Sequence, residues 1–466
     1  MSVTLTNLED ESAPSLEVAS TYLLDFFSTG GRSVLVRGDP GTGKTSLVLQ
    51  LLDYHSKNGF KSVYMSTRLS AKTLKSHQPW VDVVQGKYGT VPRLADEQIG
   101  FQDSRRMDGV RAISGLRQYL EQVNNPFVVL DSWEGLFFES HMLGVEEISK
   151  LVEDYDARFV VVTERREQTD LDYLLDGVVV LRRKFHEGMI VREIELKKLR
   201  GVSIKQSRFL FTLDSGKFRY LPPISTYDFG GDSVGEPIPN LDSKTCSSGN
   251  KVLDSILEGG FKHGSLNLVE IANDVPTGAR NLFFRTVFSN FVNTGHQILY
   301  VPFVGFAKGE IGDLLPNFSK ETISSNVSTM WFDSSKSKKS DVLHGELVQD
   351  LELLYSKSEY MREESSKPVL AVFFEDAMEG LYGKESVAKE LARSVTTLKA
   401  NGTVRMQVTS PDSALLSELR AMCDSSLRIE MIHGTPVIFS TKPSSVLNGM
   451  VADMRNRGKV SLVPIV

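Results

Sequence analysis

The sequence predicts an α/β fold that is built twice in tandem, each time as a mostly parallel sheet flanked by helices. Short apolar runs alternate with helical stretches, which is typical of parallel sheets. A glycine-rich loop joins one apolar run to a helix near the start of the chain. A buried apolar run with an acidic end, which follows this loop in the first half, recurs at residues 369–376 in the second half.

Composition limits the class of protein. A chain of 466 residues is too long for one ordinary core, so two or three domains are expected. Its 41% hydrophobic and 24% charged residues are typical of soluble globular proteins, and its formal net charge of −6 argues against a dominant nucleic-acid surface. The start lacks a signal peptide and no run of about 18 apolar residues occurs, so we expect a cytoplasmic protein that does not span a membrane. We expect the two cysteines, Cys246 and Cys423, to be reduced thiols.

The glycine-rich loop fits the phosphate-binding pattern G-x-x-x-x-G-K-[ST] at every fixed position. An apolar strand at 33–36 leads in and a helix at 46–52 leads out, a context that a chance glycine-rich turn lacks. Its backbone N–H groups and the helix N-terminus would face a polyphosphate. Lys44 would reach the β- and γ-phosphates, and the Thr45 hydroxyl would ligate Mg²⁺. The expected nucleotide-binding residues are Gly38, Asp39, Pro40, Gly41, Thr42, Gly43, Lys44, Thr45 and Ser46.

A second site residue follows from residues 127–131 (FVVLD), which read as a buried strand with Asp131 at its carboxyl end. Ligands of open α/β sheets bind beyond the carboxyl ends of strands. Asp131 is therefore predicted to join Thr45 in the Mg²⁺ site. The same pattern arises by chance in many chains, and the preceding loop favours the functional interpretation.

The other elements of the first half follow from periodicity and turn residues. We expect helices over 15–30 and 108–123 and strands over 61–66 and 158–163. Residues 177–181 and 189–196 form a hairpin turning at Glu187-Gly188, and the second strand ends in Lys198-Leu199-Arg200-Gly201. Because side chains alternate along a strand, Lys198 and Arg200 point the same way, as a phosphate clamp or as an ordinary solvated strand end.

The order of phosphate loop, Asp131 strand, Thr163-Glu164-Arg165 strand end and Lys198-Leu199-Arg200-Gly201 resembles the KaiC-like branch of the RecA superfamily over about residues 15–222. The two-domain form resembles the archaeal type. The resemblance implies two tandem RecA-like domains, each with a C-terminal β-hairpin. It also implies ATP and Mg²⁺ as cofactors, and Lys44, Lys198 and Arg200 as catalytic residues.

In that family the Lys-x-Arg pair reaches the neighbouring subunit's nucleotide, so the resemblance implies a homo-oligomer in which Lys198 and Arg200 act in trans. Residues 64–70 (YMSTRLS) and 78–80 (QPW) are similar to the archaeal gas-vesicle regulator D group.

One departure concerns hydrolysis. The family places a glutamate just after the second strand to polarise the attacking water, whereas this chain has Ser66-Thr67-Arg68-Leu69. We therefore expect nucleotide binding with slow turnover. Glu134 and Glu164 could substitute in part, although neither stands at the family position. Arg68 could contact phosphate, contact a partner or lie on the surface.

The domain organisation is predicted as a flexible N-terminus (1–14), an ATP-binding domain (15–222), a linker (223–248) and a degenerate domain (249–466). Aligned on glycine, Gly278 matches Gly43, which puts Ala279 at the lysine position and Arg280 at the threonine position. Asp376 matches Asp131 in this alignment. The serine- and lysine-rich stretch 333–340 is predicted to be an exposed loop, with nucleic-acid binding as the alternative. A last hairpin over 426–439 lacks a Lys-x-Arg-Gly end.

Three functions remain open at this point. The first is a nucleotide switch in signal transduction or transcriptional control, with an unidentified protein partner. The second is a recombinase-like, DNA-dependent ATPase, which the acidic charge and the missing glutamate disfavour. The third is a scaffold whose oligomer is held together by nucleotide.

Overall fold

A computed structural model describes residues 21–86, 90–137, 141–226, 236–302, 310–332, 342–452 and 459–466. The chain divides into two compact units, here called the first and the second unit. The first contains the described residues between Ser15 and Pro222 together with Ile465–Val466, and the second those between Pro223 and Pro464. The predicted N-terminal segment 1–14, part of the predicted linker and the stretch 333–340 lie outside the described residues.

The first unit is built on one large sheet with the strand order β10-β9-β8-β7-β1-β6-β5-β2-β4-β3. The pairs from β7 to β3 are parallel, and β8, β9 and β10 continue the sheet in antiparallel fashion. The strands are β1 (Ser33–Gly38), β2 (Lys61–Ser66), β3 (Val83–Gln85), β4 (Ile99–Asp103), β5 (Pro126–Asp131), β6 (Arg158–Thr163), β7 (Gly177–His186), β8 (Met189–Leu199), β9 (Arg208–Thr212) and β10 (Arg219–Leu221).

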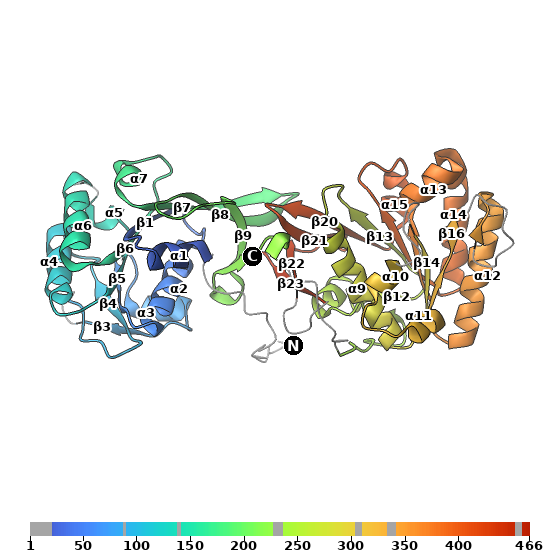
Figure 1. Ribbon diagram of the computed structural model, residues 1–466, viewed down its shortest axis with the longest axis horizontal. Helices are drawn as coiled ribbons and strands as arrows, with labels where there is room; N and C mark the ends of the chain where they lie inside the picture. Colours follow the sequence, from blue (N-terminus) through green and yellow to red (C-terminus); the bar gives the residue numbers. More distant parts are fainter. Residues whose placement is uncertain are drawn as a thin grey trace, which may run out of the picture. The chain divides into compact units, whose positions relative to one another are not determined.

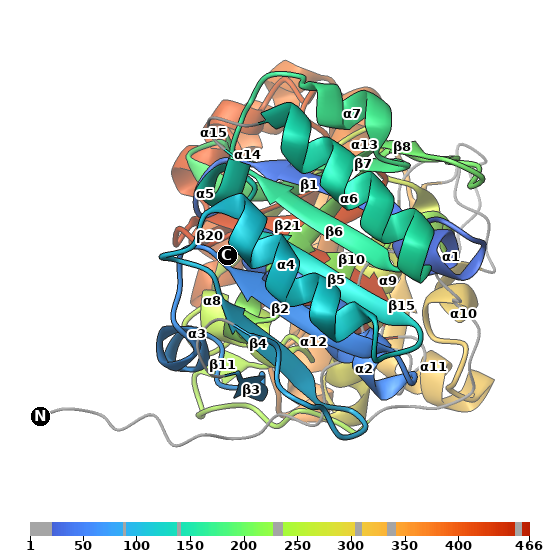
Figure 2. The same ribbon diagram turned by 90° about the vertical axis from the view of Figure 1, so that its left-hand side faces the viewer.

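Helices cover both faces of this sheet, because side chains of its buried strands alternate between two apolar cores. Val34 and Val36 face a core shared with α1, α2 and α3, whereas Leu35 faces a core shared with α4 to α7. Figure 2 shows α4 and α6 side by side across the second face. The helices are α1 (Thr21–Ser28), α2 (Lys44–Lys57), α3 (Ala71–His77), α4 (Gly109–Leu120), α5 (Glu134–Phe137), α6 (His141–Tyr155) and α7 (Asp170–Leu174), with 3₁₀ turns η1 (Asp214–Gly216) and η2 (Ile224–Thr226), the latter in the second unit.

The second unit has a large sheet of the order β15-β14-β18-β19-β13-β20-β21-β22-β23. Its pairs from β15 to β20 are parallel and the last strands are antiparallel. These strands are β13 (Leu266–Ile271), β14 (Ile298–Val301), β15 (Val327–Thr329), β18 (Leu370–Phe374), β19 (Val404–Thr409), β20 (Ser425–Ile432), β21 (Thr435–Lys442), β22 (Asn448–Ala452) and β23 (Val460–Pro464). Two small sheets pair β11 (Thr245–Cys246) with β12 (Phe261–Lys262) and β16 (Trp331–Phe332) with β17 (Val342–Leu343).

Helices again pack on both faces. A phenylalanine-rich helix, α9, contributes to the core on one face, and α12, α13 and α14 contribute to cores on the other (Figure 1). The helices are α8 (Lys251–Ile256), α9 (Thr277–Asn293), α10 (Glu310–Leu314), α11 (Lys320–Asn326), α12 (Leu347–Ser365), α13 (Glu375–Tyr382), α14 (Lys384–Ala400) and α15 (Leu416–Met422).

The two units share one topology. The order β7-β1-β6-β5-β2-β4 of the first corresponds strand for strand to β20-β13-β19-β18-β14-β15 of the second. A register shift also falls at the same place in both terminal hairpins, after Val178 and after Ser426. The predicted fold class, an α/β chain of two tandem RecA-like sheets with C-terminal antiparallel strands, is confirmed. No helix among the described residues is long and apolar enough to cross a membrane.

Candidate nucleotide site

The glycine-rich loop lies between the carboxyl end of β1 and the first turn of α2, which begins at Lys44. Gly41 and Gly43 have φ angles of 76° and 97°, which side-chain-bearing residues rarely adopt. A Cβ atom on Gly38 would come within 2.7 Å of the Leu181 carbonyl oxygen. The backbone path of the loop therefore requires glycine at all three positions.

Lys44 lies folded into this loop. Its side chain is 7% exposed, and Nζ donates hydrogen bonds to the carbonyl oxygens of Gly38 (2.7 Å) and Asp39 (2.9 Å). Burial lowers the pKa of Lys44, and the carboxylates of Glu164 and Asp131 oppose that shift. The ammonium group therefore lies inside the loop. The negative charge of a polyphosphate bound there would offset the cost of burying this ammonium group.

The predicted magnesium ligands meet at the carboxyl edge of the sheet. Asp131 Oδ2 accepts hydrogen bonds from the Thr45 hydroxyl (2.8 Å) and from the Tyr64 hydroxyl (2.7 Å). Tyr64 is buried on β2, and burial together with the charge of Asp131 raises its pKa well above the usual value. Thr45 thus contributes a hydroxyl and Asp131, at the end of β5, a carboxylate. Mg²⁺ prefers such oxygen ligands, so these residues fit that ion.

Other loop residues make local contacts. The Thr42 hydroxyl donates to the Asp39 carbonyl oxygen (2.8 Å), and Ser46 Oγ accepts a hydrogen bond from Gln78 (3.1 Å). Asp39 forms an ion pair with Arg166 (2.6 Å). Residues 165–170, which follow β6, line a hollow of about 730 Å³. Pro40 is exposed.

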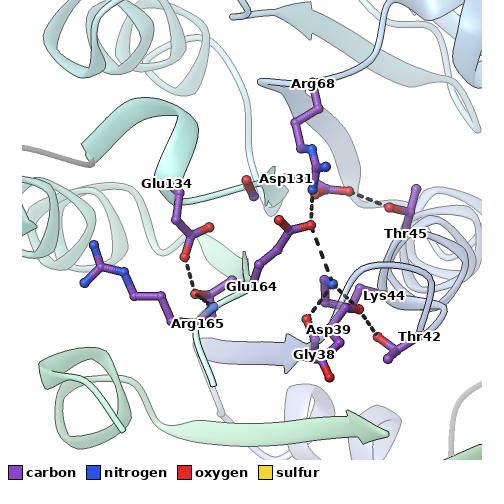
Figure 3. Close-up of polar contacts among 12 residues, drawn as sticks. Gly38, Asp39, Thr42, Lys44, Thr45, Arg68, Asp131, Glu134, Glu164 and Arg165 are labelled. Carbon is purple, nitrogen blue, oxygen red and sulfur yellow. Dashed lines mark hydrogen bonds and ion pairs between the residues drawn. The ribbon is translucent and has the colours of Figure 1, made fainter. Parts of the chain in front are cut away.

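Two carboxylates flank the loop (Figure 3). Glu164 Oε1 lies 3.9 Å from Lys44 Nζ and also forms an ion pair with Arg68. Glu134 accepts a hydrogen bond from the Thr163 hydroxyl, and its other oxygen is buried without a partner among the described residues. Glu134 and Glu164 were both predicted as partial substitutes for the glutamate that is missing after the second strand. Of the two, Glu164 contacts Lys44.

Lys198 and Arg200 lie at the other end of the same sheet, where the parallel strand β7 begins, away from the carboxyl ends that carry the loop. Strand β8 runs antiparallel to β7, so Lys198 pairs with Val178 near the start of β7, whereas Gly38 pairs with Leu181. Lys198 Nζ donates to the Asp172 carbonyl oxygen (2.6 Å), and Arg200 pairs with Asp176 (3.1 Å). The structure does not bring these two cations to the loop of their own chain.

In the second unit, the element boundaries revise the glycine-based alignment. Five residues separate Gly38 from Lys44, and five separate Ile271, the last residue of β13, from Thr277, the first of α9. Thr277 and Gly278 therefore stand at the positions of Lys44 and Thr45, and the expected match of Ala279 and Arg280 is wrong by two residues. Lysine and hydroxyl are absent in either alignment.

The match of Asp376 with Asp131 is also wrong. Asp131 lies opposite Val162 in the sheet, and the residue at the same position in the second unit, opposite Val408, is Phe374. Asp376 instead lies in α13, where its carboxylate accepts hydrogen bonds from the Ser410 backbone N–H and hydroxyl, both at 2.9 Å.

Tyr64 is a site residue that the sequence did not predict, because a tyrosine flanked by Val63 and Met65 is typical of an ordinary core strand. Nor did it predict Arg192, whose guanidinium donates to the Gly41 carbonyl oxygen (3.1 Å). Neither residue belongs to the phosphate-loop pattern, and no signal in the sequence links either of them to the loop.

A strand, a glycine-rich loop and a helix, with Thr45 and Asp131 meeting at the carboxyl edge of a parallel sheet, define a P-loop ATPase domain of the RecA type. Residues 24–220 match the family described as "ATPase: KaiC". Residues 24–220 therefore form a KaiC-like ATPase domain.

The relatives of the chain agree. It is 26% identical to Protein GvpD2 of Halobacterium salinarum over 92% of each chain. It is 27% identical to Protein GvpD1 of the same organism over 59% of this chain and 54% of that protein. The circadian clock oscillator protein KaiC of Thermostichus vulcanus is 25% identical over 57% of this chain and 52% of its own length. The chain is thus homologous to GvpD and KaiC, and it spans about half the length of GvpD1 and KaiC.

Proposed function

We propose that the first unit binds ATP with Mg²⁺, hydrolyses it slowly, and uses the bound nucleotide as a regulatory switch in signal transduction or transcriptional control. The observation that carries this proposal is the contact of Thr45 and Asp131 beside the buried Lys44. Lys44 binds the β- and γ-phosphates, and the loop N–H groups of residues 38–46 surround them. Thr45 and Asp131 hold Mg²⁺, which supplies charge neutralisation on the phosphates.

We further propose that the second unit does not bind nucleotide. Thr277, Gly278 and Phe374 stand at the positions of Lys44, Thr45 and Asp131, so neither a phosphate-binding lysine nor a magnesium ligand is present there. We propose that the switch acts on a protein partner.

Lys198 and Arg200 serve the nucleotide of a neighbouring copy. Their position at the end of the sheet away from the loop supports a trans role, because it separates them from the nucleotide site of their own chain. KaiC-like ATPases are oligomeric nucleotide-binding proteins, which supports a homo-oligomer.

The test compares wild type with Lys44→Ala and with Thr277→Ala, its matched control in the second unit. Titration with a fluorescent ATP analogue and single-turnover hydrolysis are measured with and without single-stranded DNA. Loss of one charged contact should weaken ATP binding roughly 10- to 100-fold in Lys44→Ala. Thr277→Ala should bind like wild type, and turnover in wild type should be slow and independent of DNA.

Strong stimulation by DNA would instead favour a DNA-dependent ATPase. Nucleotide-dependent assembly on a sizing column without any turnover would favour a scaffold. Equal affinity in wild type and Lys44→Ala would refute a nucleotide site at this loop.

A further inference from the structure

The end of β2 offers no group that could activate water. Thr67 follows this strand, and its hydroxyl is already engaged with the backbone of Ser132, accepting from N–H (2.8 Å) and donating to the carbonyl oxygen (3.2 Å). Arg68 carries only donors. Hydrolysis needs an acceptor that orients the attacking water, so a carboxylate must come from another element.

Strand β6 is placed to provide that carboxylate. It lies between β1, which leads into the phosphate loop, and β5, which ends at Asp131. Glu164 is the first residue after β6 and therefore emerges between the loop and the predicted magnesium ligand. Its Oε1 atom lies 3.9 Å from Lys44 Nζ, and Figure 3 shows the carboxylate pointing between Lys44 and Arg68.

Arg68 holds this carboxylate by an ion pair to the same oxygen atom, Oε1. The Arg68 side chain is 51% exposed and that of Glu164 is 28% exposed. A pair this open to water contributes little free energy and can break at small cost. The contact therefore restrains Glu164 without fixing it permanently.

The other nearby glutamate, Glu134, has one carboxylate oxygen hydrogen-bonded and the other buried without a partner among the described residues. Glu134 lies at the start of α5 and accepts a hydrogen bond from Thr163. In Figure 3 its side chain lies on the far side of Glu164 from Lys44. Glu164 therefore has the more direct approach to a phosphate bound by Lys44.

We propose that Glu164 is the catalytic carboxylate that orients the attacking water, and that Arg68 is a latch that restrains Glu164 and slows turnover. This inference rests on the proposed ATP-binding function of the loop. Water attacks the γ-phosphorus and passes a proton to Glu164. The bond from phosphorus to the β–γ bridging oxygen breaks, and its electron pair leaves with ADP. Glu164 then returns the proton to the inorganic phosphate.

The test uses the full chain with the variants Glu164→Gln, Arg68→Ala and the double variant. Glu134→Gln tests the competing carboxylate, and Glu167→Gln is a control at an exposed glutamate on the same segment. ATP affinity is measured first, then single-turnover hydrolysis at saturating ATP with Mg²⁺. Affinity for ADP with aluminium fluoride, a mimic of the transferring phosphoryl group, gives a readout independent of turnover.

Glu164→Gln should keep ATP binding, lose about 100-fold in hydrolysis rate and bind the aluminium fluoride complex more weakly. Arg68→Ala should hydrolyse about 2- to 5-fold faster than wild type, since the pair that it removes is weak. That gain should disappear in the double variant.

An unchanged rate in Glu164→Gln, or a larger loss in Glu134→Gln, would overturn the assignment of Glu164. A slower rate in Arg68→Ala would overturn the latch. If wild type bound no ATP, the proposed function itself would fail, and this outcome is separate from failure of the Glu164 assignment, which requires ATP binding without dependence on Glu164.

Discussion

In the first unit the strand before the loop carries Arg37, which forms a buried ion pair with Asp172 of α7; at the same position of the second unit, Glu270 pairs with Arg420 of α15. The positions match because Arg37 lies opposite Thr163 of β6 and Glu270 opposite Thr409 of β19. Both pairs tie the central strand to the helix that precedes the next parallel strand. The connection is present in both units although its polarity is reversed.

Other parts of the frame are shared too. Asp176 accepts hydrogen bonds from the backbone N–H of Arg32 (3.3 Å) and the hydroxyl of Ser33, and Asp424 accepts one from the N–H of Leu266 (2.8 Å) at the start of β13. The contacts that hold the central strand are thus kept in both units, whereas the groups that would bind nucleotide are present in one. The residues that would bind nucleotide can therefore be changed without changing the contacts that hold the central strand.

Removing the acidic partner of each reversed ion pair should destabilise the first unit more than the second. In the first unit both side chains are nearly fully buried, at 4% and 5% exposure, so Asp172→Asn leaves the Arg37 charge without its partner. The free energy of unfolding should fall by about 3–5 kcal/mol. Glu270→Gln should cost less, because the Arg420 side chain is 46% exposed and can turn to water, and Arg428, the second partner of Glu270, keeps its ion pair with Glu430.

Denaturant titration with hydrogen exchange resolved by unit would measure both effects. The double variant Arg37→Glu with Asp172→Arg gives the first unit the polarity of the second and should recover most of the loss. Equal losses in the two single variants would show that burial does not distinguish the pairs.

The stabilities of the two units should depend on pH in opposite directions. Burial lowers the pKa of His55 on α2 to about 4, so the first unit's free energy of unfolding should fall as pH drops from about 6.5 to about 4. Burial raises the pKa of Glu375 in the second unit to about 7, against the opposing charge of Arg405, with Glu379 and Asp376 adding to the rise. Its folded form binds the extra proton, so stability should fall as pH rises from about 4.5 to about 7.

Each shift corresponds to about 3 kcal/mol of unfolding free energy. Hydrogen exchange of each unit at pH 5, 6 and 7.5 would detect the opposite slopes. Glu375→Gln should flatten the slope of the second unit and leave that of the first unchanged. A second unit that gains stability between pH 5 and 7 would contradict the assignment to Glu375.

The smallest effect concerns matched tyrosines on β2 and β14. Tyr64 lies opposite Val129 and Tyr300 opposite Val372 in the two sheets, but only the first unit has an aspartate at the end of the neighbouring strand. Tyr64→Phe removes a hydrogen bond to Asp131 and should weaken Mg²⁺-dependent ATP affinity roughly 10- to 100-fold. Affinity in excess chelator should change little.

Tyr300→Phe is the control and should bind ATP like wild type. Titrations of ATP at a series of Mg²⁺ concentrations would measure both variants. The same loss of affinity with and without Mg²⁺ in Tyr64→Phe would mean that this tyrosine supports the loop as a whole rather than Asp131.

The sequence was sufficient for the fold class and for the loop, because both depend on local patterns. Gly38, Lys44 and Thr45 are fixed by spacing along the chain, and Asp131 by the end of an apolar run. The contact of Tyr64 with Asp131 and that of Glu164 with Arg68 depend on which strands become neighbours, since β2 pairs with β5 and β6 inserts between β1 and β5. Periodicity along the chain does not reveal that order.

The second unit shows a different limit. Alignment on one glycine placed Ala279 at the position of Lys44, whereas the strand and helix boundaries place Thr277 there. The position of a glycine can differ between two loops, while the register of hydrogen-bonded strands is fixed. The predicted hairpin over 426–439 was also too short. Strand β21 continues to Lys442, which pairs with Ser426 as Lys198 pairs with Val178. The lysine of the Lys-x-Arg pair is thus present in the second unit, followed by Pro443 and Ser444.

The antiparallel course of β8 puts Lys198 and Arg200 at one end of a sheet whose other end carries the phosphate loop. In the proposed trans arrangement, the copy that supplies these cations and the copy whose nucleotide they reach would use different surfaces. Such a contact is head-to-tail and leaves one surface of each kind free at the ends of any open chain of copies. An assembly built on it closes as a ring or grows as a filament, and a two-fold dimer would not satisfy it.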